Sequence, residues 1–200
     1  MKLKSILLSL LCLFPTALSA QWFNIGKADY NWGPFHVYTL FLYTESGSYK
    51  ENERPLMLTF KYAKPVEGKN FAITLIKEID KLKITETDSK KWLEELQDVL
   101  PDFSPNDTLS YIALADKGYF VLNDTVLAHE FDGEFNRVLT AVWLSEKSNY
   151  PQLRQQLLDK SKASEQSPMA QPETAPLDEE NANPELPPNY KLHNRTKEMS

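Results

Sequence analysis

The chain has 200 residues, of which 42% are hydrophobic, 12% aromatic and 25% charged. This composition is that of a globular protein and excludes a collagen, a coiled coil or a wholly disordered chain. A formal net charge of -6 provides no basic field for phosphates, so nucleic acid is not expected as a partner. A single cysteine and three histidines are too few ligands for a zinc or iron-sulfur centre, and we expect no metal or other cofactor.

The N-terminus has the three parts of a secretory signal peptide. Lys2 and Lys4 form a positive start, residues 5–14 form an apolar run, and a stretch of small residues ends at Ala20. A membrane span needs about 20 apolar residues, which is about twice the length of this run. We therefore predict a cleaved signal peptide over residues 1–20, a periplasmic protein, and no membrane span after cleavage.

The C-terminal segment differs in composition from the rest of the chain. Residues 161–200 hold six of the thirteen prolines and an acidic run at 178–180, and they lack Gly, Phe, Trp, Ile and Val. Such a segment cannot bury enough apolar surface to offset its ordering entropy. We predict a disordered, acidic, Pro-rich tail. The alternative is a spacer, or a tail that binds a partner through residues 190–193.

Residues 21–160 are long enough for one domain, and their first half predicts strands followed by helices. Residues 35–43 are rich in aromatic and apolar side chains, and residues 56–62 alternate; both runs are typical of strands. A helical stripe then begins near Gly68 or Asn70, and a second helix follows residues 85–88 and stops at Pro101. The predicted inward side chains are Phe71, Leu75, Ile79, Leu82, Trp92, Leu93, Leu96 and Leu100.

The second half repeats this order. Residues 109–115 have period two, residues 116–118 form a turn, and strands over 119–122 and 125–131 are joined by a hairpin at Asn123-Asp124. Asp132 is expected to cap the next helix, and Pro151 to begin a short one that ends near Lys160. The inward side chains are Phe135, Val138, Leu139, Val142, Trp143, Leu153, Leu157 and Leu158. The pattern indicates an α+β domain, with a curved antiparallel sheet backed by helices and its other face open or holding a ligand.

Four blocks in this order resemble the exported bacterial chalcone isomerase-like proteins. They are Phe35-His36-Val37-Tyr38 through Tyr43; Pro55 to Phe60 with Lys69-Asn70-Phe71; Pro105-Asn106-Asp107-Thr108; and Phe131 to Phe135 with Val142-Trp143-Leu144. Together they span residues 23–160. The resemblance implies an open-faced β-sandwich, a curved antiparallel sheet backed by helices.

The resemblance also implies where a site lies. Plant chalcone isomerases hold an anionic phenol with an arginine before the first of these strands and use a threonine on it, and fatty-acid-binding relatives keep an arginine and a tyrosine. Here the arginine position is Tyr30, the threonine position is Tyr38, and no arginine precedes Arg54. A tyrosine phenol offers one neutral hydrogen-bond donor, whereas an arginine guanidinium offers several donors and a positive charge. Tyr30, His36 and Tyr38 are therefore the predicted ligand-binding residues, and none is predicted to be catalytic.

Other residues have simpler interpretations. His36 is a candidate base or replacement cation, although a solvent-facing strand residue is the favoured interpretation. His129 is expected to face water and to pair with Glu130 or Asp132. The aromatic run of Trp32, Phe35, Tyr38, Phe41 and Tyr43 lines an apolar ligand cleft or packs in the core.

The sequence thus predicts a non-catalytic periplasmic domain that binds a small hydrophobic ligand such as a fatty acid. One alternative is an isomerase, an intramolecular lyase with a site rebuilt from Tyr30, His36 and Tyr38. Another is a structural partner in an envelope complex that uses the acidic tail; the sequence does not identify a protein partner.

Overall fold

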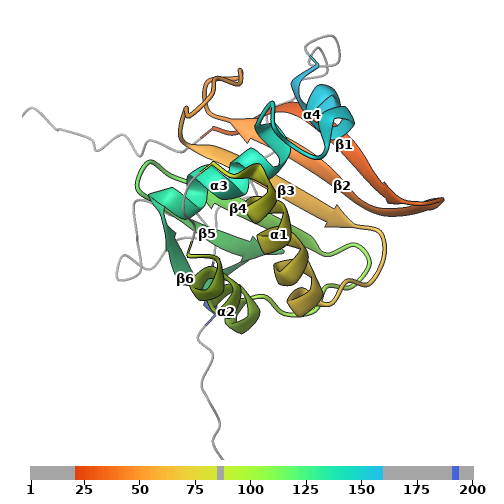
Figure 1. The fold of residues 1–200 in the computed structure, drawn as a ribbon, viewed down its shortest axis with the longest axis vertical. Helices are drawn as coiled ribbons and strands as arrows, with labels where there is room; N and C mark the ends of the chain where they lie inside the picture. Colours follow the sequence, from red (N-terminus) through yellow and green to blue (C-terminus); the bar gives the residue numbers. More distant parts are fainter. Residues whose placement is uncertain (1–20, 85–87, 160–190, 194–200) are drawn as a thin grey trace, which may run out of the picture.

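The computed structural model describes residues 21–84, 88–159 and 191–193. It shows a sheet with helices packed on one side (Figure 1). The elements in chain order are β1 (Phe23–Trp32), β2 (Phe35–Thr44), β3 (Leu56–Tyr62), α1 (Gly68–Leu82), α2 (Ser89–Val99), β4 (Thr108–Ala113), β5 (Lys117–Leu122), β6 (Thr125–Asp132), α3 (Gly133–Leu144), α4 (Pro151–Leu158) and β7 (Lys191–His193).

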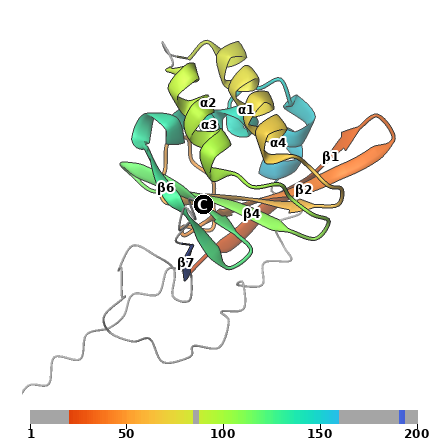
Figure 2. The same ribbon diagram turned by 90° about the horizontal axis from the view of Figure 1, so that it is seen from below.

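The sheet is a meander in which each strand lies beside its neighbour in the chain. Strands β1 to β6 are antiparallel in the order of the sequence, and β7 pairs in parallel with the outer edge of β6. The helices α1, α2, α3 and α4 all lie on one face of this sheet (Figure 2). The predicted α+β class, with an antiparallel sheet backed by helices, is therefore confirmed.

The helix ends follow from local chemistry. The Asp132 carboxylate accepts a hydrogen bond of 2.8 Å from the Phe135 backbone N–H, which confirms the predicted cap of α3. Asp88 caps α2 in the same way, through the N–H of Lys91. Pro101 follows Leu100 at the other end of α2, where a proline would remove the next helical hydrogen bond.

The main core lies between the sheet and the helices. Every predicted inward side chain of the four helices is buried except Leu93 and Leu158, which are partly buried against the same core. A second, smaller cluster lies on the opposite face of the sheet, so that face is not bare. It contains Trp22, Met57, Ile112, Tyr119, Val121 and Val126.

Strand β1 was missed by the sequence analysis because its alternation is broken. Register shifts interrupt its pairing with β2 between Asn24 and Gly26 and again between Tyr30 and Asn31. A Cβ at Gly26 would lie 2.0 Å from the Leu157 carbonyl oxygen, so this glycine lets α4 pack directly on β1. A close approach of this kind removes the side chain that would have marked the strand.

Two other predictions need adjustment. Lys117 and Gly118, expected in a turn, belong to β5, and Ala115, expected on the inward face, is exposed in the preceding turn.

The predicted signal peptide lies outside the described residues. So does most of the predicted tail, of which only Lys191–His193 is described, as β7. Within the described part of the chain, no helix has the length and apolar character to cross a membrane.

Candidate functional site

Tyr30 and Tyr38, two of the three predicted site residues, lie side by side. They are directly paired across β1 and β2, and their rings stack with centroids 4.8 Å apart. His36 has other partners: its Nε2 lies 3.3 Å from the Thr39 hydroxyl, which in turn donates to Asp29 at 2.7 Å. The structure therefore groups the two tyrosines and places His36 in a separate, partly exposed polar chain.

The two tyrosines belong to a larger group that we call the tyrosine cluster: Tyr30, Tyr38, Tyr62, Trp143 and Tyr150. Tyr38 is at its centre, with the ring of Tyr62 5.9 Å away and edge-on, while Tyr150 meets Tyr30 edge-on at 5.9 Å. Tyr38, Tyr62 and Trp143 are buried, whereas Tyr30 and Tyr150 are half-buried at its rim. The cluster lies under α1, α3 and α4 at the β1 side of the sheet.

Burial favours the protonated form of three phenols in this cluster, those of Tyr38, Tyr62 and Tyr150. Desolvation raises the pKa of Tyr38 far above its usual range, and the neighbouring Trp143 indole opposes this rise only in part. Desolvation likewise raises the pKa of Tyr62 and of Tyr150, and the Glu78 carboxylate adds to the rise at Tyr150. These hydroxyls can donate hydrogen bonds. Because they stay protonated near neutral pH, they cannot act as general bases there.

Two polar groups in the cluster are left without a partner among the described residues. They are the Tyr62 hydroxyl and the Trp143 indole N–H, which lies near the Tyr38 hydroxyl but does not meet hydrogen-bond geometry. The nearby Glu78 is already engaged, by Lys81 at 2.6 Å and by the Asn149 amide at 2.8 Å. The cluster is a tightly packed aromatic region with incomplete hydrogen bonding.

Arg54, the first arginine of the chain, makes its contacts outside the tyrosine cluster. Its guanidinium donates to the Thr140 hydroxyl at 3.0 Å and to the Glu53 carbonyl, between the loop before β3 and helix α3. Desolvation lowers the pKa of this guanidinium from its usual value. The nearby Tyr111 donates to Asn136, so this buried polar network involves different residues from the tyrosine cluster.

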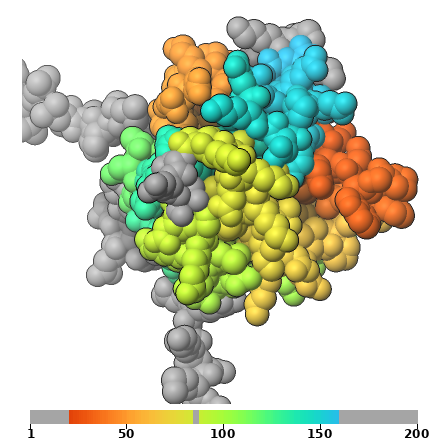
Figure 3. Space-filling model, viewed as in Figure 1, coloured from red at the N-terminus to blue at the C-terminus, as the bar shows by residue number. Residues whose placement is uncertain are grey.

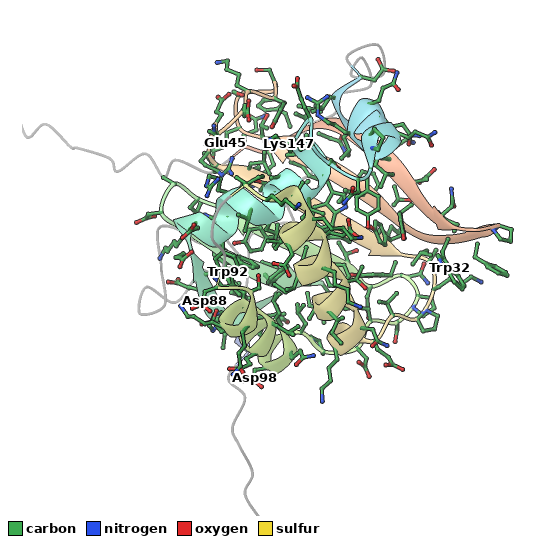
Figure 4. The ribbon with its side chains drawn as sticks, viewed as in Figure 1. Trp32, Glu45, Asp88, Trp92, Asp98 and Lys147 are labelled. Carbon is green, nitrogen blue, oxygen red and sulfur yellow. The ribbon has the colours of Figure 1, made fainter. Side chains whose placement is uncertain are left out.

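A hollow large enough for a ligand lies at the other edge of the sheet. It is an open groove of about 590 Å³ between α2 and β6, which we call the α2–β6 groove. Its volume is within the range of small-molecule sites. Figure 4 shows Asp98 at this end of α2, far from Trp32 at the tip of β1. The lining residues are Glu95, Asp98, Val99, Pro101, Leu122, Asn123, Thr125, Leu127, Ala128 and His129.

His129 joins the two walls of the groove. Its Nε2 lies 3.6 Å from the Glu95 carboxylate on α2, and its ring packs edge-on against Phe131 at 4.5 Å. The predicted pairing of His129 with Glu130 or Asp132 is wrong. Glu130 pairs with Lys117 instead, at 3.2 Å, and Asp132 caps α3. Because α2 packs across β6, the half-buried His129 reaches an acid distant in sequence.

The sequence analysis did not identify this groove. Its apolar side chains are of ordinary core type, and its polar residues come from α2, which ends at Val99, and from the region of β6, which begins only at Thr125. The available signal was a histidine two residues from Leu127 and Phe131 on the same face of a strand. A histidine among inward-facing side chains needs a hydrogen-bonding or charged partner. Such a partner has to come from an element that packs against the strand.

The aromatic run on β2 does not line a single cleft. Tyr38 is in the core, and Phe41 and Tyr43 pack together on the opposite face with centroids 6.4 Å apart. Trp32 and Phe35 are exposed at the hairpin tip. In the described part of the chain, no group of three potential metal ligands comes together.

No protein-family model matches the chain. It is similar to a protein of Haemophilus influenzae described as uncharacterized, with 54% identity over 199 residues that cover 98% of each chain. Identity of this extent along both proteins indicates common ancestry and a shared fold. The chain therefore belongs to the same family as this Haemophilus influenzae protein.

Proposed function

We propose that the protein is a non-catalytic, periplasmic binding protein of the chalcone isomerase-like type, and that it takes a small hydrophobic ligand in the α2–β6 groove. The observation that carries this proposal is the groove itself, a hollow of about 590 Å³ whose lining combines apolar side chains with polar groups from both α2 and β6. Hydrophobic area supplies affinity in such a site, and the polar groups orient the ligand.

The lining residues suggest the chemistry of the ligand. Val99, Leu122 and Leu127 offer a surface for an apolar body, whereas Glu95 and Asp98 place carboxylates at its margin. A carboxylate head group would meet like charge there, which costs free energy where solvent screening is reduced. A neutral head group is favoured, so a fatty acid would bind in its protonated form.

Binding without catalysis fits the available side chains. Tyr38 occupies the position where the resemblance implies a catalytic threonine, and its buried phenol is a donor whose raised pKa prevents it from serving as a base. The described lining residues of the groove include no Arg or Lys that would stabilise an oxyanion.

The test is to purify the exported protein, extract it with organic solvent and analyse the extract by mass spectrometry. We expect a small hydrophobic compound in stoichiometric amount with the wild type and much less with Thr125→Phe. Thr125 lies two positions before Leu127 on the same face of β6, so a ring at this position would occupy the groove.

A matched control makes the same change elsewhere. Thr39→Phe alters a half-exposed threonine of β2 outside the groove and is expected to retain the compound. If no hydrophobic compound is recovered from the wild type and none binds when added, the proposed function is wrong.

A further inference from the structure

Two aromatic side chains at the tip of the β1–β2 hairpin are left uncovered. Trp32 is 71% exposed and Phe35 is 55% exposed, and they are the only large hydrophobic side chains in this state among the described residues. All other described large apolar side chains are at least partly covered. Two such residues at one turn constitute a local feature that requires an explanation.

The two rings form one patch. Trp32 and Phe35 are directly paired across the turn, and directly opposed residues of antiparallel strands point to the same face. The residues between them, Gly33 and Pro34, carry no charge and no side-chain hydrogen-bonding group. The tip is therefore apolar over four consecutive positions.

The hairpin projects beyond the rest of the sheet. The pairing of β2 with β3 ends at Tyr38 and Tyr62, so the last residues of the hairpin extend past the neighbouring strand. Figure 3 shows this hairpin protruding from the body of the molecule, and a Cβ built on Gly33 would meet nothing within 4 Å. A register shift between Tyr30 and Asn31 lies at the base of the tip, where such irregularities increase local twist.

We propose that this tip, Trp32-Gly33-Pro34-Phe35, inserts into the interface of a lipid bilayer. The proposal goes beyond the ligand-binding function and does not depend on it, because the tip and the α2–β6 groove lie at opposite edges of the sheet. Indole and phenyl rings partition into the lipid headgroup region, where an apolar body and a polar edge are both accommodated.

The small area of the tip favours lipid over a protein partner. An aromatic side chain has roughly 150–250 Å² to bury, so the exposed parts of two rings offer only about 200–300 Å². A stable protein interface buries about 800 Å² on each partner and requires a complementary shape. A convex, uncharged tip of this size can enter the fluid surface of a bilayer without a shaped receptor.

The chain offers a direct spectroscopic test. Of its four tryptophans, Trp22, Trp92 and Trp143 are buried, so a change in emission on adding vesicles reports on Trp32. With vesicles of phosphatidylcholine, we expect the wild type to cosediment and its emission to shift to the blue. Trp32→Phe should retain binding and lose the shift, because it keeps a ring at the tip.

Loss of the two rings should weaken binding to vesicles strongly. Trp32→Ser combined with Phe35→Ser is expected to weaken partition by about tenfold or more for each ring, the factor that corresponds to burial of one such side chain. The matched control is Phe41→Ala, which removes a half-exposed ring of β2 six positions away from the tip residue Phe35 and should leave partition unchanged. Equal melting temperatures would establish that all variants are folded.

The proposal would be overturned by no cosedimentation of the wild type, by equal binding of the double-serine variant, or by equal loss of binding in Phe41→Ala. Binding that requires phosphatidylglycerol and disappears with salt would also overturn it, because that pattern indicates lysine-driven adsorption instead of insertion of an uncharged tip.

Discussion

The tyrosine cluster and the α2–β6 groove both combine aromatic or apolar side chains with polar groups, but they differ in packing. In the cluster the rings contact one another directly, with stacked or edge-on neighbours about the buried Tyr38. In the groove, α2 and β6 diverge and leave a hollow of about 590 Å³. The comparison teaches that aromatic and polar side chains can pack closely at one edge of a sheet, while a hollow remains at the other edge of the same sheet.

The largest expected difference between the two regions is their response to alkali. Tyr38 and Tyr62 have pKa values raised by burial, so the folded state favours the neutral phenol. Their contribution to stability is fully present below the unfolded-state pKa of about 10 and is lost as the pH rises above it, at about 1.4 kcal/mol per pH unit for each phenol.

We therefore expect unfolding above pH 10, and the phenolate absorbance that Tyr38 and Tyr62 contribute, measured as the difference between the wild type and a variant with Phe at both positions, should appear together with loss of circular dichroism. Replacing both tyrosines by Phe should make the pH dependence shallower, whereas His129→Gln in the groove should leave it unchanged. If that difference in absorbance appears while the chain remains fully folded, the cluster is open to solvent.

A second difference concerns the free energy of unfolding. Tyr38→Ala would leave a large void among Tyr30, Phe60 and Tyr62, and we expect a loss of about 3–5 kcal/mol. His129→Ala removes a partly exposed contact with the Glu95 carboxylate and should cost less than about 1 kcal/mol. Denaturant titrations of both variants measure the contrast, and similar losses would contradict the distinction between a packed region and an open one.

The smallest expected effect on the free energy of unfolding comes from removing single tyrosine hydroxyls in the core while their rings are kept. Tyr111→Phe removes a hydroxyl that donates to Asn136 at 2.5 Å and should cost about 1–3 kcal/mol. Tyr62→Phe is the matched change at a hydroxyl without a partner and should alter stability by less than about 0.5 kcal/mol. A substantial loss in Tyr62→Phe would mean that its hydroxyl is bonded in solution.

Local patterns predicted most of the fold. The period of Phe71, Leu75 and Ile79 and the cap at Asp132 depend on neighbours in the chain, so they could be read directly. Strand β1 could not, because its irregular register and Gly26 reflect packing against α4, a helix near the far end of the domain.

The candidate site was predicted less completely for the same reason. Pairing of adjacent strands brings Tyr30 to Tyr38, two residues that the sequence had suggested as candidates. The groove depends on how α2 crosses β6, and no spacing in the sequence reports that angle. The contact of His129 with Glu95 therefore emerged only with the tertiary structure.

The central claim, that the groove rather than the tyrosine cluster binds ligand, is tested by titrating the protein with a fluorescent fatty-acid probe. We compare Thr125→Phe, which fills the groove, with Tyr38→Phe, which removes only the hydroxyl at the centre of the cluster. The account predicts an affinity loss of about tenfold or more for Thr125→Phe, the value of one buried apolar side chain, and little change for Tyr38→Phe. Full affinity in Thr125→Phe with loss in Tyr38→Phe would contradict the account and assign binding to the tyrosine cluster.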